Sequence, residues 1–482
     1  MEIQRKLLKT HYRKLKGIKS LPLKNVSPEI PIRSDLLSAY YDSKPYHQCL
    51  NRYGNSLVDL RPEIIGLSRE MNNFPREVIN IFRVTGKLAE KYQIEAYVTG
   101  GFVRDLLLRR NNKDLDLVIT GDLENFIRAL ADRLGGEWSY NREFHTGNIQ
   151  LSTGFNLDLA ESRREYYPRS GALPEVEPAD LLEDLFRRDF TVNTLLLVLK
   201  PDGWGRILDF FQGSKDVERG LLRVLHRFSF LDDPTRIIRG IRLAVGLGFA
   251  FARETKALLK EALTVADFSI LSTSRVLKEL RLLFADRVTP GLLRMMQEFP
   301  LFKLLNLEIE IKADFFRQFK ELEAYLEYFQ EKNYNIKVWL LRMAVFLEDI
   351  HKQEIEEWGL SALNQRILSS YARNRGILSR LNRELDPVEL VKLLKGLTTE
   401  EIILLLVKSG KGKIKENLLY HLEELADREI EINGFDLQEM GLKPGPEIKD
   451  ILQKVYHAKL RGELKNRREE LAFAEKLIKR WE

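Results

Sequence analysis

Cysteine is nearly absent from this chain: its 482 residues include one, Cys49. A single cysteine excludes an internal disulfide bond and a zinc site made of several cysteines, and it suits a reducing compartment. The chain also lacks any apolar run near the roughly 18 residues that cross a bilayer, and its N-terminus lacks the apolar core of a signal peptide. The sequence therefore predicts a cytoplasmic protein without a membrane partner.

Histidine is scarce as well, and the seven histidines are scattered. None of them is followed by aspartate, so the sequence shows neither an evident histidine metal cluster nor a His-Asp phosphohydrolase signature. Charge is plentiful: 31% of the residues are Asp, Glu, Lys or Arg, with a formal net charge of +6. A mildly basic chain favours a polyanionic partner such as nucleic acid. The length predicts several domains, each with its own core.

The most informative stretch is Y-V-T-G-G-F-V-R-D-L-L-L-R-R-N-N-K-D-L-D-L-V-I-T, residues Tyr97–Thr120. Its pattern predicts a short buried strand, a turn at Gly100 and Gly101, a helix, and a second strand. Glycines permit a sharp turn, and the N–H groups at the start of the following helix favour a phosphate. On the second strand Asp114 and Asp116 alternate with leucines, so both carboxylates share one face. This pair predicts an oxygen-ligated Mg²⁺ site beside nucleotide phosphates.

Two further strands are expected at 144–151 and 155–160, and the second carries Asp158. A third carboxylate on a neighbouring strand would complete an acidic triad with Asp114 and Asp116 and could take the proton from an attacking hydroxyl. Each feature alone has a bland alternative, because most D-x-D pairs are solvated surface residues and most Gly-Gly pairs are turns. The order strand, glycine pair, helix, acidic strand is much more specific.

A second motif, R-R-D-F-T-V-N, begins at Arg187. Arg187 and Arg188 offer two guanidinium groups for a triphosphate, and Asp189 and Asn193 can bond ribose hydroxyls. Paired arginines by themselves are mostly surface residues. Their position after a carboxylate-bearing strand and before an apolar run favours nucleotide binding.

A third motif, L-D-D-P-T-R-I-I-R-G-I-R, predicts a helix that Asp233 caps. Arg236 and Arg239 fall on one ridge of that helix. An aspartate accepts from an exocyclic amine and an arginine donates to ring acceptors, so Asp233 and Arg236 could read the edge of ATP or CTP, while Arg239 supports them or reaches a phosphate. The alternative is a capped amphipathic helix with a solvated basic face.

Two segments are expected to be irregular. Residues 1–73 begin with eight lysines and arginines against one acid in the first two dozen positions. These could touch RNA phosphates, although a solvated chain end is the alternative. The segment 163–181, rich in tyrosine and proline, predicts a long loop.

From residue 268 onward the pattern predicts helices alone. A basic, glycine-rich loop at 408–415 could touch backbone phosphates or be a solvated turn. Near the end, K-P-G-P-E-I-K places Lys443, Gly445 and Lys449 at the start of a helix, where exposed N–H groups would grip RNA phosphates without reading sequence. A plain connection between helices is the alternative.

Taken in order, these motifs resemble the class II tRNA nucleotidyltransferase and poly(A) polymerase family, strongly over 95–251 and moderately over 432–464. The resemblance implies an α+β fold: a nucleotidyltransferase head with a small mixed β-sheet flanked by helices, followed by all-helical neck, body and tail domains. The expected boundaries are a basic segment of unknown role at 1–73, the catalytic head at 74–205, a nucleotide-selecting neck at 206–290, a helical body at 291–385 and a tRNA-binding tail at 386–482.

The resemblance also implies template-independent transfer of nucleotides from ATP, and in some subtypes CTP, to the 3′ hydroxyl of tRNA with release of pyrophosphate. Asp114 and Asp116 would carry Mg²⁺, and Asp158 would assist deprotonation. The nucleotide would be positioned by Gly100, Gly101, Arg104, Arg187, Arg188, Asp189, Asn193, Asp233, Arg236 and Arg239, and the tRNA by Lys443, Gly445 and Lys449.

Three subtypes stay open: full CCA addition, terminal-A addition and poly(A) synthesis. The motif E-Y-Y-x-x-x-G-x-L-P-x-V-E resembles that of long-form bacterial members, several of which add only the last adenosine. This resemblance favours the A-adding subtype. A non-catalytic RNA-binding protein on a decayed head is the alternative of another class. It predicts a broken acidic position, whereas Asp114, Asp116 and Asp158 are all present.

Overall fold

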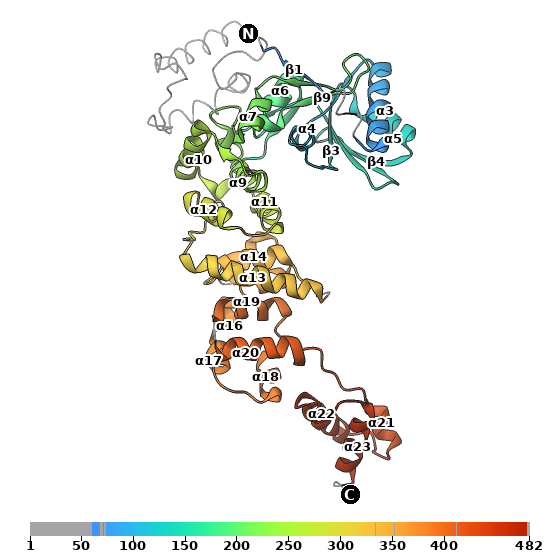
Figure 1. Ribbon diagram of the computed structural model, residues 1–482, viewed down its shortest axis with the longest axis vertical. Coiled ribbons are helices and arrows are strands. Elements are labelled where there is room, and N and C mark those ends of the chain that lie inside the picture. Colours follow the sequence, from blue (N-terminus) through green and yellow to red (C-terminus); the bar gives the residue numbers. More distant parts are fainter. Residues whose placement is uncertain are drawn as a thin grey trace. The chain divides into compact units, whose positions relative to one another are not determined.

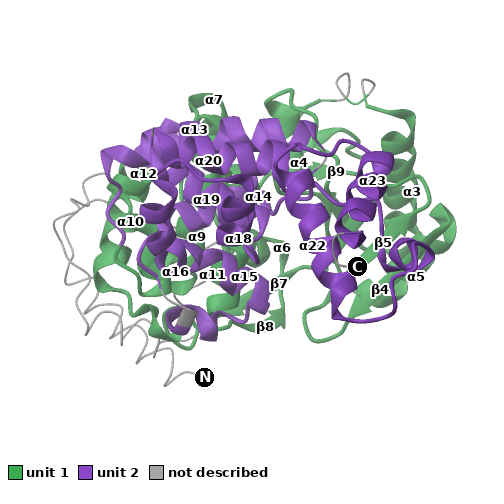
Figure 2. Cartoon of the chain, turned by 90° about the horizontal axis from the view of Figure 1, so that it is seen from below, with its two compact units in different colours: residues 1–279, 295–308 green, residues 280–294, 309–482 purple. Residues whose placement is uncertain are grey.

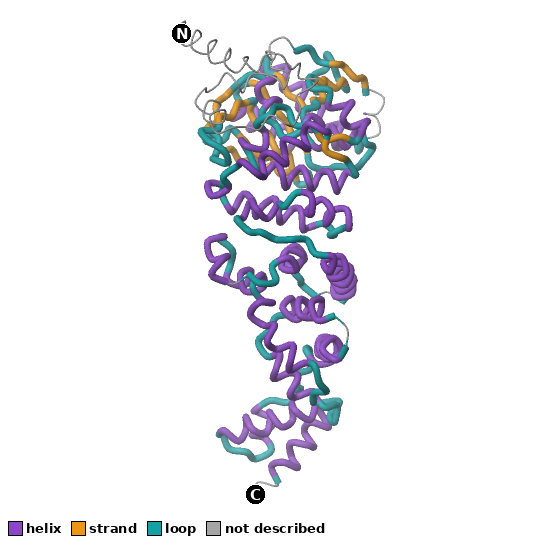
Figure 3. The backbone as a smooth tube through the Cα atoms, turned by 90° about the vertical axis from the view of Figure 1, so that its left-hand side faces the viewer, coloured by secondary structure: helices purple, strands orange, loops and turns teal. Residues whose placement is uncertain are grey.

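The computed structural model describes residues 60–67, 71, 74–332, 334–350, 352–410 and 412–479. Most of the predicted basic segment 1–73 lies outside these residues, as does Lys411 of the predicted glycine-rich loop. The chain divides into two compact units, Met1–Glu279 with Met295–Glu308 and Leu280–Arg294 with Ile309–Glu482 (Figure 2). The strands of the described residues all belong to the first unit (Figure 3).

Eight strands of the described residues form one mixed sheet in the order β1-β10-β9-β2-β3-β6-β5-β4 (Figure 1). Their bounds are β1 (Glu63–Gly66), β2 (Glu95–Val98), β3 (Leu115–Thr120), β4 (Gly136–Asn141), β5 (Thr146–Leu151), β6 (Asn156–Glu161), β9 (Leu196–Val198) and β10 (Arg206–Asp209). Strands β3 and β6 are parallel, and the other neighbours are antiparallel. The central strands β2 and β9 are almost completely buried.

Helices α3 (Arg76–Tyr92) and α5 (Leu123–Leu134) pack against each other on one face of the sheet (Figure 1). Each presents an apolar stripe to the sheet, which buries Phe82 from α3 and Phe126 from α5 completely. Asp122 caps α5 by accepting from the Asn125 amide at 3.1 Å. The apolar stripes and the cap thus determine where the two helices lie on the sheet. The acidic residues are carried by the strands of that sheet.

The other elements of the first unit follow the sheet in sequence. The helices are α4 (Gly101–Leu107), α6 (Leu181–Phe186), η4 (Thr191–Asn193), α7 (Gly213–Arg219), α8 (Ser229–Asp232), α9 (Thr235–Leu247), α10 (Arg253–Val265), η5 (Phe268–Ile270) and η6 (Leu301–Leu305). The short strands are β7 (Arg163–Tyr166), β8 (Glu175–Pro178), β11 (Leu221–Leu222) and β12 (Ala250–Phe251). Helices α11 (Thr273–Ala285) and α12 (Pro290–Glu298) carry residues of both units.

The predicted loop at 163–181 is not irregular throughout, because its two ends pair as the antiparallel hairpin β7–β8. Arg164 on β7 donates to Glu177 on β8 at 2.8 and 3.1 Å, and such cross-strand ion pairs favour pairing. The prolines that suggested a loop lie between the strands or at the end of an edge strand, where proline is tolerated.

The second unit is helical, and no strand occurs in the described residues from 268 to 479, as the sequence predicts. Its helices are α13 (Ala313–Glu331), α14 (Val338–Phe346), η7 (Lys352–Trp358), α15 (Ala362–Leu368), α16 (Ser370–Asn374), η8 (Arg375–Ile377), α17 (Leu378–Leu381), α18 (Pro387–Leu394), α19 (Thr399–Ser409), α20 (Lys413–Tyr420), the π-helical η9 (His421–Leu425), α21 (Gly434–Glu439), α22 (Pro446–Leu460) and α23 (Arg467–Ile478).

Side chains cap the starts of two of these helices. Asp386 accepts from the Val388 amide at 2.9 Å at the start of α18, and Thr398 forms a capping box with Glu401 at the start of α19. The last three helices close around their own apolar cluster, centred on Leu437, Ile451 and Val455. Among the described residues no helix combines the length and the apolarity that a membrane crossing requires.

Candidate active site

Two of the three predicted catalytic aspartates stand side by side on parallel strands. Asp116 of β3 and Asp158 of β6 are direct partners in the strand register. The leucines that flank each of them along the strand are buried, so the two carboxylates leave the opposite face together. Asp158 is exposed and Asp116 is half-buried. Asp114 is exposed and precedes β3, which begins at Leu115 rather than at the predicted residue 114.

The charges of these aspartates act on one another. Burial raises the pKa of Asp116, the negative charges of Asp158 and Asp114 raise it further, and Arg188 opposes them. All three donors are carboxylate oxygens, which a small divalent cation prefers and whose mutual repulsion it would relieve. No three His, Cys, Asp or Glu side chains of the described residues already stand in a chelating arrangement. Asp114 and Asp116 therefore remain predicted ligands.

Asp116 and Asp158 line a cavity of about 640 Å³, and Asp114 is not among its lining residues. This size suits a small-molecule ligand. One wall comes from the first motifs: Thr99, Gly100, Asp116, Leu117, Asp158, Leu159, Ala160 and Arg188. The other wall is the β4–β5 hairpin, with Ser139, Tyr140, Asn141, Thr146, Gly147 and Asn148. Sequence reasoning missed this hairpin wall. The available signal was a row of polar residues on a strand expected to pair with that of Asp158, and Asn148 indeed donates to Asp158 at 2.7 Å.

The predicted glycine turn is present and requires glycine. Gly100 has a φ of 69°, and a β-carbon there would meet the Asp116 carboxylate oxygen at 3.2 Å. At Gly101, where α4 begins, a β-carbon would stand 3.4 Å from the guanidinium of Arg104. The turn thus lets backbone lie directly against the acidic cluster.

Three predicted nucleotide-binding residues form a chain of hydrogen bonds and do not line the cavity. Arg104 is buried, donates to Asp105 at 2.9 Å and donates to the Asn193 side-chain oxygen at 2.9 Å. The Asn193 amide nitrogen in turn donates to Asp189 at 2.9 Å. Burial would raise the pKa of Asp189, but Arg239 and the Asn193 hydrogen bond outweigh it and lower that pKa. Asp189 is therefore ionised and held on several sides.

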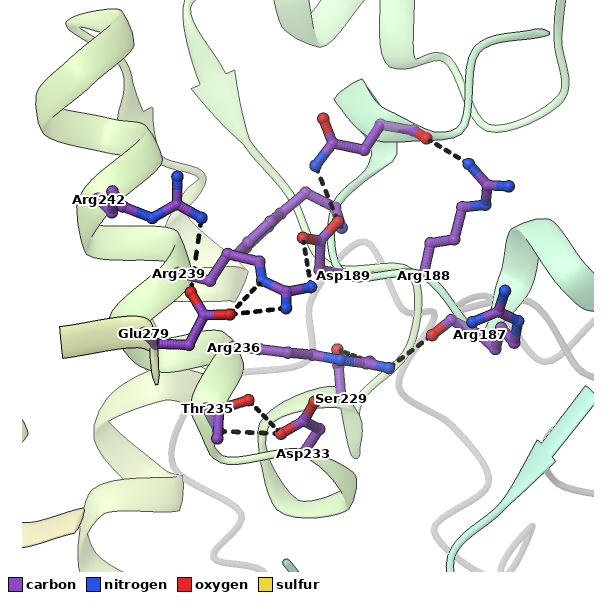
Figure 4. Close-up of polar contacts among 12 residues, drawn as sticks. Arg187, Arg188, Asp189, Ser229, Asp233, Thr235, Arg236, Arg239, Arg242 and Glu279 are labelled. Carbon is purple, nitrogen blue, oxygen red and sulfur yellow. Dashed lines mark hydrogen bonds and ion pairs between the residues drawn. The ribbon is translucent and has the colours of Figure 1, made fainter. Parts of the chain in front are cut away.

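The two arginines of the second motif point to different places (Figure 4). Arg188 borders the cavity of the aspartates. Arg187 borders a separate void of about 20 Å³, together with Glu165, His226 and Arg236. Burial, followed by the charge of Arg236, lowers the pKa of His226 to about 3, so this ring is neutral. The structure brings Arg188, and not Arg187, to the acidic cleft.

The third motif is held by other protein groups (Figure 4). Asp233 accepts from the amide of Thr235, the first residue of α9, at 3.1 Å, whereas the residue directly before the helix is Pro234 and not the predicted Asp233. Asp233 also pairs with Arg275 at 2.8 Å. Arg236 is buried and donates to Ser229 at 2.7 Å and to the carbonyl oxygen of Arg187. These residues do not line the cavity of the aspartates.

Arg239 of the same helix bridges two acids. It lies 2.8 Å from Glu279 and 3.5 Å from Asp189 (Figure 4). Arg242 shares Glu279 at 3.5 Å. Arg239 therefore connects the Asp189 network to α11.

The predicted RNA contacts of the last helices are exposed. Lys443 and Gly445 precede α22, and Lys449 lies in its first turns. Gly445 has an extended backbone, with φ of −176°, and the carboxylate of Glu447 packs against it. The three contacts with RNA remain predictions.

The chain is similar to known proteins over most of its length. Two family models match: a poly A polymerase head domain over residues 96–223 and a tRNA nucleotidyltransferase domain 2 over residues 347–474. An A-adding tRNA nucleotidyltransferase of Geobacter sulfurreducens is 29% identical over 466 residues, covering 92% of this chain and 52% of the relative. Another A-adding tRNA nucleotidyltransferase, of Halalkalibacterium halodurans, is 30% identical over 401 residues, covering 82% of this chain and 92% of the relative.

A solved structure, the Thermotoga maritima CCA-adding enzyme complexed with tRNA-CCA, matches with a TM-score of 0.71 and 26% identity. The match covers 86% of this chain and 99% of that one, and it confirms the predicted α+β fold. The chain spans about half the length of the Geobacter relative but nearly all of the Halalkalibacterium one. This chain belongs to the tRNA nucleotidyltransferase family. Nucleotidyltransferases of this family generally use a divalent metal ion.

Proposed function

We propose that the protein is a nucleotidyltransferase that completes the 3′ end of tRNA by adding AMP from ATP and releasing pyrophosphate. One observation carries the proposal: Asp116 and Asp158 are register partners that open, beside Gly100 and Arg188, onto one cavity. The names of the relatives support the choice of tRNA as substrate. A cytoplasmic location fits a substrate of this kind.

The proposed chemistry is in-line attack of the RNA 3′ hydroxyl on the α-phosphate. Asp158 is exposed at the cavity and oriented by Asn148, so it can accept the proton of that hydroxyl. Arg188 supplies a positive charge for the phosphates, and Gly100 allows them to approach the backbone. Asp114 and Asp116 would hold Mg²⁺, which when bound supplies charge stabilisation at the phosphates.

Nucleotide selection is proposed for α9. Asp233 and Arg236 carry the acceptor and donor pattern that a base edge requires. Both are bonded to protein groups, so reading a base would require an exchange of those partners. Lys443, Gly445 and Lys449 are proposed to hold tRNA phosphates without reading sequence.

The test is incorporation of labelled nucleotide into tRNA transcripts that end before the CCA, after its first cytidine or after its second. An A-adding enzyme extends only the transcript ending in two cytidines, and only with ATP. A CCA-adding enzyme also uses CTP on the shorter transcripts. Absence of incorporation into every transcript would contradict the proposal, and retained tRNA binding alongside it would identify a non-catalytic RNA-binding protein.

Poly(A) synthesis is the second candidate, because the head matches a poly A polymerase domain. The same assay separates it. A poly(A) polymerase would add long adenosine tails to an RNA that has no tRNA fold, whereas the proposed enzyme adds one residue and stops.

A further inference from the structure

Asp184, on α6 three residues before the arginine pair, has no role in the function proposed above. Its side chain is completely buried. A buried carboxylate is costly unless it is paired and hydrogen-bonded. Burial alone would raise its pKa, yet Arg187 and Arg188 together lower it, so Asp184 is buried as an anion.

Each of the two oxygens of the Asp184 carboxylate accepts hydrogen bonds from a different arginine. One oxygen accepts from Nε and Nη2 of Arg187, at 3.0 and 2.8 Å. The other accepts from Nη2 of Arg188 at 2.8 Å. Because consecutive arginines share a single carboxylate through different oxygens, neither guanidinium can rotate without giving up a buried hydrogen bond.

The other nitrogens of the two guanidinium groups donate to different parts of the protein. Nη1 of Arg187 donates to Glu165 on β7 at 2.8 Å. Nη1 of Arg188 donates to the Thr99 hydroxyl, next to Gly100, and to the carbonyl oxygen of Asn193 at 3.2 Å. Within the described part of the chain, the buried Nε of Arg188 has no hydrogen-bond partner. Arg188 is the member of the pair that borders the cavity of Asp116 and Asp158.

We propose that Asp184 is a positioning residue that holds Arg188 at the acidic cavity for the nucleotide phosphates and anchors Arg187 away from it. This inference rests on the proposed nucleotidyl transfer. Asp184 touches neither substrate nor reacting atoms, and it acts through Arg188. Arg187, in turn, is a supporting residue whose guanidinium joins Asp184 to Glu165 and does not contact phosphate.

The test is a double-mutant cycle in the full-length protein, with KM for ATP measured on a tRNA that ends in two cytidines. Asp184→Asn keeps the shape of the side chain but replaces one acceptor oxygen by a donor, so the KM for ATP is expected to rise roughly tenfold or more. Arg188→Ala is expected to raise it at least as much. In the Arg188→Ala background, Asp184→Asn is expected to add less than about twofold, because the group through which it acts is gone.

Glu165→Gln is the matched control. It weakens the outer contact of Arg187 in the same buried network and leaves the Arg188 contacts in place, so the KM for ATP is expected to change less than about twofold. Asp184→Glu, which keeps the charge and shifts its position, replaces Asp184→Asn in the cycle if the latter does not fold. Multiplicative effects of Asp184→Asn and Arg188→Ala, or equal effects of Asp184→Asn and Glu165→Gln, would overturn the proposal. Wild-type protein without activity would overturn the proposed function instead.

Discussion

The acidic cleft and the arginine network, which consists of Arg239 and Arg242 with Asp189 and Glu279, arrange their charges in opposite ways. In the cleft, like charges are brought together: Asp116 and Asp158 are register partners, and their repulsion helps to raise the pKa of Asp116. In the network, opposite charges are matched, as where Arg239 bridges Glu279 and Asp189. The cleft is open to solvent, whereas Glu279 and Asp189 are buried.

This difference distinguishes residues that bind a ligand from residues that hold other residues in place. Side chains that bind a charged ligand keep a charge that no protein group neutralises, and the ligand neutralises it when it binds. Groups that hold such residues in place are compensated inside the protein, because a buried unpaired charge would destabilise the fold. Substitutions in the cleft should therefore change activity more than stability, and substitutions in the network should do the reverse.

Removal of divalent metal is expected to have the largest effect. Chelation with EDTA should reduce nucleotide incorporation to background, since the clustered carboxylates of Asp114 and Asp116 then repel rather than bind the phosphates. Mg²⁺ in excess should restore incorporation, as measured by single-nucleotide extension on a gel. Full activity in EDTA would mean that the cleft needs no cation.

Asp116→Ala should reduce incorporation roughly 10³-fold or more, because several kcal/mol of transition-state stabilisation correspond to that factor. Binding of tRNA and the melting temperature should stay close to those of the wild type. Asp132→Ala, at an exposed position of α5, is the control and should be fully active. Wild-type activity in Asp116→Ala would rule out the proposed mechanism.

Glu279→Ala should have the opposite profile, a loss of stability that exceeds the loss of activity. Removing the carboxylate leaves Arg239 and Arg242 without their shared partner, and the loss of hydrogen bonds to a charged group costs about 2 kcal/mol in the free energy of unfolding. Glu279→Gln retains one acceptor oxygen and should lose less. Urea unfolding measures the stability of both variants. If the wild type and the two variants were equally stable, Glu279 would not be neutralising the charges of Arg239 and Arg242.

Much of the cleft could be predicted from sequence because its signals are local. Gly100 and Gly101 mark a turn, and the alternation around Asp116 and Asp158 fixes which face each carboxylate takes. The pairing of β3 with β6 is less local, because α5 and the β4–β5 hairpin lie between these two strands in the chain. The positions of both aspartates follow from these patterns.

The contacts of the arginine pair could not be predicted in the same way. Arg187 and Arg188 are adjacent and chemically identical, so sequence alone gives both of them to the triphosphate. Asp184 lies one helical turn before both arginines and contacts both, so it does not distinguish them in the sequence. Glu165, which contacts Arg187, becomes a neighbour only in the folded chain. The hairpin wall was missed for a related reason, since the residues 136–141 of β4 alternate weakly and lie at the edge of the sheet.

The smallest expected effect concerns stability and pH at Asp116. Its folded-state pKa is raised above 3.8, so the folded protein holds this proton more tightly than the unfolded chain does. Stability from this group is present at low pH and is lost as pH rises through the folded pKa. Asp116→Asn, which carries no charge, should therefore unfold at a higher urea concentration than the wild type at pH 7, although it is inactive.

That difference should shrink as the pH is lowered toward 3.8, because the wild-type carboxyl then becomes protonated in both states. Urea titrations of the two proteins from pH 7 downward measure it, with Asp132→Asn as the control for the change in net charge. If Asp116→Asn were less stable than the wild type at pH 7, the carboxylate would be stabilising the fold. The charges of the cleft would then be neutralised by protein groups, as those of the arginine network are, and the two regions would not differ in this respect.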